Sequence, residues 1–177
     1  ALRDLALYDT LTELPSRILF TDRLNRSLLL AERNQTSCVL MYLDLDNFKV
    51  INDTAGHETG DQVLREVSRR MASSVRVTDT VCRWGGDEFL ILIPQSASRA
   101  ELIEFARRLI THISEPIVIK GKARRVSASI GIACFPAEGQ TPTALHAVAD
   151  DALYHAKRKG KGCVFLAADL GENDPSY

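Results

Sequence analysis

The chain has 177 residues, of which 45% are hydrophobic and 25% charged, a composition typical of one globular domain with its own core. Its 22 Lys and Arg side chains nearly balance its 23 Asp and Glu side chains, giving a net charge of −1. This balance excludes the strongly basic field that binds nucleic-acid polymers, so no such partner is expected. The longest apolar runs, CVLMYL and FLILI, are far too short to span a bilayer.

The four cysteines are widely spaced in apolar segments and form no CxxC pair or zinc-ligand spacing. We therefore expect buried, reduced thiols, and with no signal peptide in the sequence we expect a cytoplasmic location. The alanine start and the polar end GENDPSY indicate a fragment of a longer protein, of which this chain would be a cytoplasmic part. The cysteines are Cys38, Cys82, Cys134 and Cys163.

Apolar periodicity in the first half of the chain predicts a helix, a strand, a second helix and a pair of strands. Helical spacing follows Pro15 and Ser16 and continues to about residue 33. The next segments are predicted as a buried strand (37–46), an amphipathic helix (60–75) after a turn-rich stretch, and two strands (79–84 and 88–94) joined at Gly85-Gly86.

The second half predicts a helix at 98–113, strands at 116–120 and 124–136, a helix at 141–160 and a closing strand at 163–168, with Ser98 as an N-cap. Two neighbouring pairs of strands have the pattern of hairpins. We therefore predict one α+β domain over 1–177, with its core at about 8–168. A mixed, largely antiparallel sheet flanked by helices fits better than a purely parallel one.

Acidic residues lie at the ends of two predicted strands. Asp44 and Asp46 are two residues apart, so both project from one face of the first strand. Such carboxylates repel each other unless a cation compensates them, and Mg²⁺ commonly takes one or two carboxylates together with substrate phosphates. The alternative is that they cap turns or pair with Lys or Arg.

The second acidic pair, Asp87 and Glu88, directly follows Gly85 and Gly86. Adjacent residues in an extended backbone point to opposite sides, and the two glycines permit positive φ and close backbone approach. A hairpin tip that carries carboxylates to a metal fits this stretch, and an ordinary exposed turn fits it as well.

The segment NFKVINDTAGHETGD offers groups for a nucleotide, although neither a Walker A loop nor a GxGxxG motif occurs. Lys49 could meet a phosphate, and Asn52 with Asp61 could pair with a guanine edge. Each has an ordinary alternative: a turn for Asn52, the first helical turn for Asp61 and a loop for His57. The lysines of YHAKRKGKG, which would suit a solvated helix end equally well, are Lys157, Lys159 and Lys161.

Taken together and in this order, the motifs resemble those of the GGDEF domain family of bacterial diguanylate cyclases. The resemblance covers nearly the whole chain and implies a fold like the palm of polymerases and the core of nucleotide cyclases, with a ferredoxin-like core. It also implies a longer, multidomain signalling protein. The matching stretches are DTLTELPSR (9–17), YLDLDNFKVINDTAGHETGDQVL (42–64), RWGGDEF (83–89), SIGIA (129–133) and ADDALYHAKRKGKG (149–162).

The resemblance implies a role for each matching residue. Mg²⁺, with Mn²⁺ as the alternative, would be held by Asp44, Asp87 and the backbone carbonyl of Leu45. Glu88 is the candidate that assists deprotonation of the attacking 3′-hydroxyl, a role that Asp87 could share. The substrate-binding residues would be Asn52, His57 and Asp61 at the guanine, and Asn47, Phe48, Lys49, Lys157 and Lys161 at the triphosphate, with Lys157 also catalytic.

The family reaction joins two GTP molecules into cyclic di-GMP and releases two pyrophosphates. Each domain holds one GTP, so the resemblance implies a homodimer. The RxxD at Arg76 and Asp79 stands where the family binds its product as an inhibitor, with Arg107 or Arg108 as a further contact, although RxxD also arises by chance at helix ends. Two departures from the family pattern are GKGC in place of GRNR at residues 160–163 and Ser16 in place of Asn.

Three functions are therefore open. The first is an Mg²⁺-dependent cyclase with product inhibition, which the intact acids and guanine contacts favour. The second is a catalytically weak module that binds GTP or cyclic di-GMP and regulates an attached domain. The third is an interaction domain without a nucleotide, which would predict no Mg²⁺-dependent stabilisation by GTP.

Overall fold

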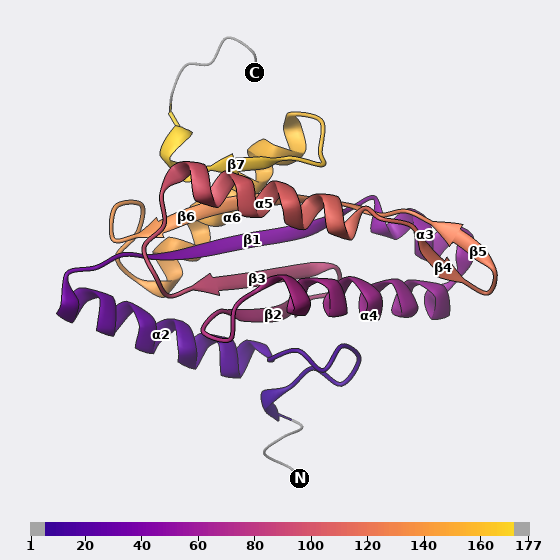
Figure 1. Ribbon diagram of the computed structural model, residues 1–177, viewed down its shortest axis with the longest axis horizontal. Coiled ribbons are helices and arrows are strands. Elements are labelled where there is room, and N and C mark those ends of the chain that lie inside the picture. The colour runs from indigo at the N-terminus through magenta and orange to yellow at the C-terminus, as the bar shows by residue number, and fades with distance from the viewer. Residues whose placement is uncertain (1–5, 172–177) are drawn as a thin grey trace.

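The run CVLMYLDLD forms the central strand of the protein in a computed structural model that describes residues 6–171 (Figure 1). Five strands make one sheet in the order β2-β3-β1-β6-β7, antiparallel except for the parallel pair β6–β7, so the predicted mixed sheet is confirmed. The strands are β1 (Cys38–Asp46), β2 (Thr80–Gly85), β3 (Glu88–Ile93), β6 (Ser127–Phe135) and β7 (Val164–Leu166). A separate two-stranded sheet pairs β4 (Ile117–Ile119) with β5 (Lys122–Arg124).

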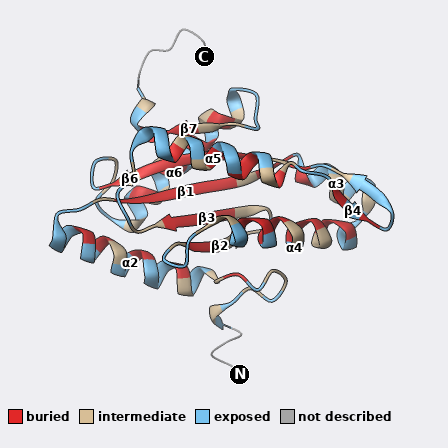
Figure 2. Ribbon diagram, viewed as in Figure 1, coloured by how far each residue is buried: buried red, intermediate tan, exposed pale blue. Residues whose placement is uncertain are grey.

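Helices cover both faces of the five-stranded sheet. The apolar sides of α4 and α5 pack on one face, and those of α2 and α6 pack on the other (Figure 1). Figure 2 shows β1 and β3 as buried along most of their length, which is why these strands are nearly continuous apolar runs. The helices are α2 (Arg17–Asn34), α3 (Phe48–Ala55), α4 (His57–Ser74), α5 (Arg99–Ile113), α6 (Pro142–Arg158) and the short 3₁₀ helix η1 (Ala167–Asp169).

Local sequence signals explain where several of these elements begin. Ser98 caps α5 in a reciprocal capping box with Glu101, as predicted for the N-cap. The side chain of Thr141 caps α6, and Pro142 occupies its first turn. A Cβ on Gly131 of β6 would lie 2.3 Å from backbone atoms of α6. The glycine therefore lets α6 lie directly on the sheet.

Three element predictions were wrong in detail. The turn-rich stretch NDTAGHETG (52–60) forms the end of α3 and the first turn of α4, which begins at His57. The strand predicted at 124–136 is divided between β5 and β6. The closing strand ends at Leu166 and continues as η1.

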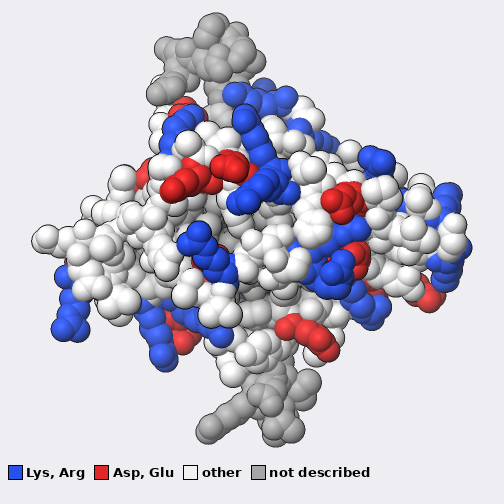
Figure 3. Space-filling model, in the orientation of Figure 1, with Lys and Arg blue, Asp and Glu red and all other residues white. Residues whose placement is uncertain are grey.

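The thiols are free, but the expectation of full burial holds for Cys38 and Cys82 alone, since Cys134 and Cys163 are half-buried. Among residues 6–171, no helix has both the length and the apolar character needed to cross a membrane. Lys, Arg, Asp and Glu are intermingled on the face shown in Figure 3, in keeping with the near-zero net charge.

Candidate active site

The two acidic pairs meet at one end of the sheet, where the β2–β3 hairpin is fastened to the end of β1. In the antiparallel register Asp44 stands opposite Glu88. The backbone N–H of Leu45 donates to the carbonyl oxygen of Asp87 at 3.1 Å. The hairpin tip is therefore held against the strand that carries Asp44.

One part of the prediction for the hairpin glycines is wrong, because neither Gly85 nor Gly86 has a positive φ. The register shifts between Arg83 and Gly85, and Arg83 Nε donates to the carbonyl oxygen of Gly86 at 3.0 Å. A Cβ on Gly86 would meet nothing within 4 Å. The tip is thus open to an approaching ligand, and its glycines supply space rather than a left-handed backbone.

Within this acidic cluster, the carboxyl group of Asp44 has a strongly raised pKa. Burial, followed by the negative charge of Asp87, raises the pKa of the Asp44 carboxyl to about 7. Glu88 adds to this rise, and Lys157 opposes it from 3.5 Å. The negative charge around Asp44 is therefore only partly compensated by the protein itself.

Asp46 projects from the same face as Asp44 but serves another purpose. Its Oδ1 accepts hydrogen bonds from Lys157 Nζ at 2.8 Å and Ser129 Oγ at 2.7 Å, and its Oδ2 accepts one from the Gly162 N–H at 2.9 Å. These donors lower the pKa of the Asp46 carboxyl although its burial acts in the opposite direction. Asp46 thus takes the alternative of pairing with a lysine, and it fixes Lys157 beside the site.

The oxygen atoms at and around Asp44 are suitable ligands for a hard divalent cation. Asp44, Asp87 and the Leu45 carbonyl offer the oxygen ligands that Mg²⁺ prefers, and the raised pKa of Asp44 marks negative charge that a cation would relieve. Within residues 6–171 no three His, Cys, Asp or Glu side chains converge into a complete metal site. The protein would then supply part of the coordination, and substrate phosphates and water the remainder.

The residues predicted to bind guanine lie on α3 and α4. A Cβ on Gly60 would lie 1.9 Å from Asn52 Oδ1 and 3.3 Å from the Phe48 ring, so the Asn52 side chain rests directly on Gly60. Asp61 is the next residue of α4 and is half-buried, and His57 is exposed at the start of that helix. The structure therefore places Asn52 against the residue that precedes Asp61.

Some of the residues predicted to bind the triphosphate already contact other groups of the protein. Asn47 and Lys161 come together, with Lys161 Nζ donating to Asn47 Oδ1 at 2.8 Å, and Lys49 is exposed on α3. The side chain of Phe48 packs in the apolar core at 6% exposure. A phosphate could meet only the backbone of Phe48.

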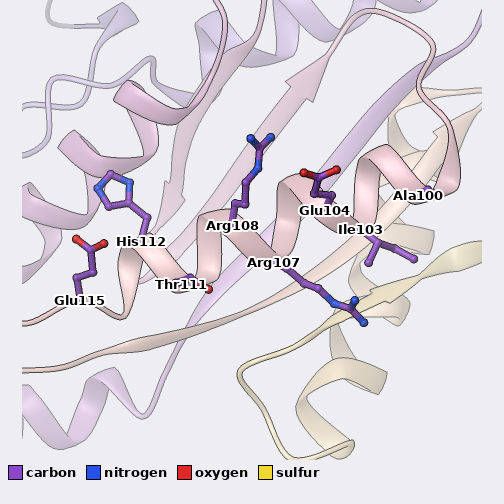
Figure 4. A pocket seen from close by; sticks show the side chains of 8 residues that line it. All are labelled: Ala100, Ile103, Glu104, Arg107, Arg108, Thr111, His112 and Glu115. Carbon is purple, nitrogen blue, oxygen red and sulfur yellow. The ribbon is translucent and has the colours of Figure 1, made fainter.

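The RxxD residues lie away from the acidic cluster, next to α5. The backbone N–H of Arg76 donates to Asp79 Oδ2 at 2.9 Å, and Arg76 Nη1 donates to Gln95 Oε1 at 3.4 Å. Arg76, Asp79 and Arg108 line one cavity of about 320 Å³. Figure 4 shows Arg107 and Arg108 pointing to different sides of α5, and Arg108 is the one that faces this cavity.

Sequence reasoning missed one residue of the acidic cluster. Tyr42 Oη donates to Glu88 Oε2 at 2.9 Å. Tyr42 precedes Asp44 by two positions, so the alternation along β1 puts both side chains on one face. That periodicity was the available signal, but the partner of the hydroxyl depends on the register of β1 with β3.

The family model described as "Diguanylate cyclase, GGDEF domain" matches residues 6–163. Among curated proteins, the chain is 43% identical over 170 residues to the bifunctional diguanylate cyclase/cyclic di-GMP phosphodiesterase MucR of Pseudomonas aeruginosa, with 96% of this chain and 25% of MucR covered. The chain spans no more than about two-fifths of the curated relatives that it matches first.

Solved structures show the same fold. The GGDEF domain of TpbB from P. aeruginosa matches with a TM-score of 0.84 and 39% identity, covering 88% of this chain and 97% of that one. The GGDEF domain of DgcB from Caulobacter crescentus, in complex with c-di-GMP, matches with a TM-score of 0.85 and 32% identity. The match covers 92% of this chain and 96% of the DgcB chain.

Proposed function

The chain belongs to the GGDEF family of diguanylate cyclases, and on this premise we propose that it condenses two molecules of GTP into cyclic di-GMP and two pyrophosphates. The observation that carries the proposal is the meeting of Asp44, Asp87 and Glu88 at one end of the sheet, with Lys157 held beside them. Phosphoryl transfer is catalysed mostly by positioning and electrostatic stabilisation, which such a cluster can supply.

Asp44, Asp87 and the Leu45 carbonyl would hold Mg²⁺, or Mn²⁺ in its place. When bound, the cation neutralises phosphate charge and stabilises the charge that develops during phosphoryl transfer. Lys157 supplies a fixed positive charge from the protein, because Asp46 holds its ammonium group next to the carbonyl oxygens of Asp44 and Leu45.

Glu88 is the proposed proton acceptor. The 3′-oxygen of one GTP attacks the α-phosphorus of the other, a new P–O bond forms, and the bond to the bridging oxygen breaks to release pyrophosphate. The proton of the 3′-hydroxyl passes to the Glu88 carboxylate, with Asp87 able to share this role. A second, equivalent step closes the ring.

Substrate binding is divided between the two ends of the nucleotide. Asn52 and Asp61, with His57 nearby, would pair with the guanine edge, which presents both donors and acceptors. The triphosphate would lie against the backbone at Asn47 and Phe48 and against the ammonium groups of the lysines Lys49, Lys157 and Lys161. Since one domain holds one GTP, two copies must face each other as a homodimer.

Product inhibition is the regulatory part of the proposal. Cyclic di-GMP would bind in the cavity lined by Arg76, Asp79 and Arg108. A guanidinium group can fork onto a phosphate or onto a guanine edge, and two of them line this cavity.

The alternative is a catalytically weak module that binds GTP or cyclic di-GMP and regulates an attached domain. It is favoured by the stretch GKGC, in which Lys161 lacks the planar fork of an arginine and already binds Asn47. Lysine still supplies the positive charge, so we place the cyclase first.

The test is incubation of the chain with GTP and Mg²⁺, followed by chromatographic separation of the nucleotides. Wild type should form cyclic di-GMP and pyrophosphate. Asp87→Ala should form neither, yet keep its melting temperature, because a hairpin-tip acid contributes little to the core. The matched control Asp22→Ala, an exposed acid paired with Arg26 on α2, should retain full turnover.

Two outcomes would contradict parts of this proposal. If Asp87→Ala worked at the wild-type rate, the assignment of Asp87 to the metal site would be wrong. Wild type that forms no product, but melts at a higher temperature with GTP and Mg²⁺, would support the binding module instead.

A further inference from the structure

The hydrogen bond from Tyr42 to Glu88 is a contact that the mechanism above does not use. Tyr42 Oη lies 2.9 Å from Glu88 Oε2, and Tyr42 is only 4% exposed. On the sheet Tyr42 stands opposite Leu90, so Glu88 is its diagonal neighbour, a distance that an aromatic side chain can bridge. The bond therefore follows from the β1–β3 register.

The ring of Tyr42 is held in place from other elements. It stacks on His146 of α6, with the ring centroids 5.0 Å apart and an interplanar angle of 23°. The ring of His146 also packs against the ring of Trp84 on β2, with the ring centroids 5.1 Å apart. The guanidinium of Arg17, at the start of α2, lies 4.4 Å from the centroid of the Trp84 ring, and its Nε donates to the Trp84 carbonyl oxygen. The hydroxyl thus points at Glu88 from a packed aromatic cluster.

The chemistry of this contact suits a carboxylate that must accept a proton at one oxygen. A phenol O–H can donate to one carboxylate oxygen, and this bond holds the carboxylate in one orientation. Among the residues that the structure describes, no other group donates a hydrogen bond to the Glu88 carboxylate. The bond occupies Oε2 and leaves Oε1 able to accept.

We propose that Tyr42 is a positioning residue for catalysis: its hydroxyl fixes Oε2 of Glu88 so that Oε1 receives the proton of the attacking 3′-hydroxyl. Tyr42 keeps its own proton throughout and touches neither GTP nor the cation. This inference rests on the proposed cyclase function.

The variant that tests it is Tyr42→Phe, which removes the hydroxyl and keeps the ring on His146. At saturating GTP we expect kcat to fall by about 10-fold, the typical effect of losing one hydrogen bond to a charged group. KM, and the rise in melting temperature caused by GTP with Mg²⁺, should stay at wild-type values. The matched control is Tyr154→Phe, whose exposed ring on α6 contacts Arg158 and should leave every value unchanged.

A double-mutant cycle with Glu88→Ala separates positioning from general support of the fold, through the midpoint of urea unfolding. Tyr42→Phe should lower the midpoint in the wild-type background and leave it unchanged, or raise it, in the Glu88→Ala background, where the hydroxyl has lost its acceptor. Equal lowering in both backgrounds, or a wild-type kcat for Tyr42→Phe, would overturn the inference. Wild type that makes no product would contradict the proposed function as well, whereas active wild type with unaffected Tyr42→Phe contradicts the positioning role alone.

Discussion

Asp44 and Asp46 share one face of one strand and have opposite electrostatic surroundings. Three donors converge on Asp46, among them the ammonium of Lys157, and lower its pKa. Asp44 faces Asp87 and Glu88, and its pKa rises to about 7. A protein gains stability from the first arrangement and loses it in the second, so the second indicates a site shaped for a ligand rather than for folding.

The raised pKa of Asp44 predicts how stability changes with pH without divalent cations. The folded protein keeps the Asp44 proton between about pH 4 and pH 7, where an unfolded chain has lost it, so stability falls as pH rises through this window. Asp44→Asn should therefore be more stable than wild type at pH 8, by about 1–2 kcal/mol after allowance for partial exposure, and nearly equal to it at pH 4.

The matched control for this measurement is Asp46→Asn, on the same strand and face. The lowered pKa of Asp46 stabilises the folded state above about pH 4, and this contribution disappears as pH falls. Asp46→Asn should therefore be less stable than wild type at pH 8 in urea unfolding. Destabilisation by both variants at pH 8 would contradict the electrostatic contrast between the two acids.

At the scale of single residues, the sequence identified the candidate site residues. It did not predict most of the contacts that their side chains make. Alternation along β1 predicts that Asp44 and Asp46 share a face, but not that Lys157, more than 100 residues away in sequence, pairs with Asp46. The bond between Tyr42 and Glu88 was missed for the same reason, since it requires the register between strands. The sequence also did not show that the side chain of Phe48 lies in the core, which leaves only its backbone for a phosphate.

Between elements, Arg70 of α4 fastens the end of α5 and the segment after it. Its Nη1 donates to the carbonyl oxygens of His112, Ile113 and Glu115, and its Nη2 to that of Pro116. These include carbonyls at the end of α5, where a helix leaves acceptors unpaired. One buried guanidinium thus closes the helix and orients the approach to β4.

Arg70→Lys should lower the free energy of unfolding by about 2–3 kcal/mol. The planar guanidinium donates to four carbonyl oxygens at once, and the compact ammonium group of a lysine cannot. Urea unfolding measures this loss. The control Arg69→Lys, at an exposed residue that binds the same Glu66, should change stability by less than about 0.5 kcal/mol. Equal losses for the two variants would show that the carbonyl contacts contribute little.

The cavity beside α5 predicts an effect on the course of the reaction. Arg76→Ala removes one of the two guanidinium groups that line it, so cyclic di-GMP should bind at least about 10-fold more weakly in calorimetry. Synthesis should then stay linear for longer as product accumulates. Unchanged affinity and unchanged curvature would mean that Arg76 and Asp79 form an ordinary surface turn.

Strong local signals predicted the elements well, and weak ones failed. The capping box of α5 and the apolar run of β1 fix those elements, and both predictions are confirmed. The stretch NDTAGHETG is rich in residues that favour turns, yet it forms the end of α3 and the first turn of α4.

At the scale of the whole molecule, one domain supplies half of what the proposed reaction needs. The acids lie at one end of the sheet and the proposed guanine contacts lie on α3 and α4, so in the proposed reaction one copy would bind one GTP. The 3′-oxygen that attacks must come from a second GTP. This requirement makes assembly of two copies the central claim of the mechanism.

The measurement that tests this claim most directly is the rate of cyclic di-GMP formation at several protein concentrations, with GTP and Mg²⁺ held constant. If two half-sites must meet, the rate per mole of protein should rise with protein concentration and then level off as dimers predominate. A rate per mole of protein that stays the same down to concentrations at which the protein is monomeric would contradict the account.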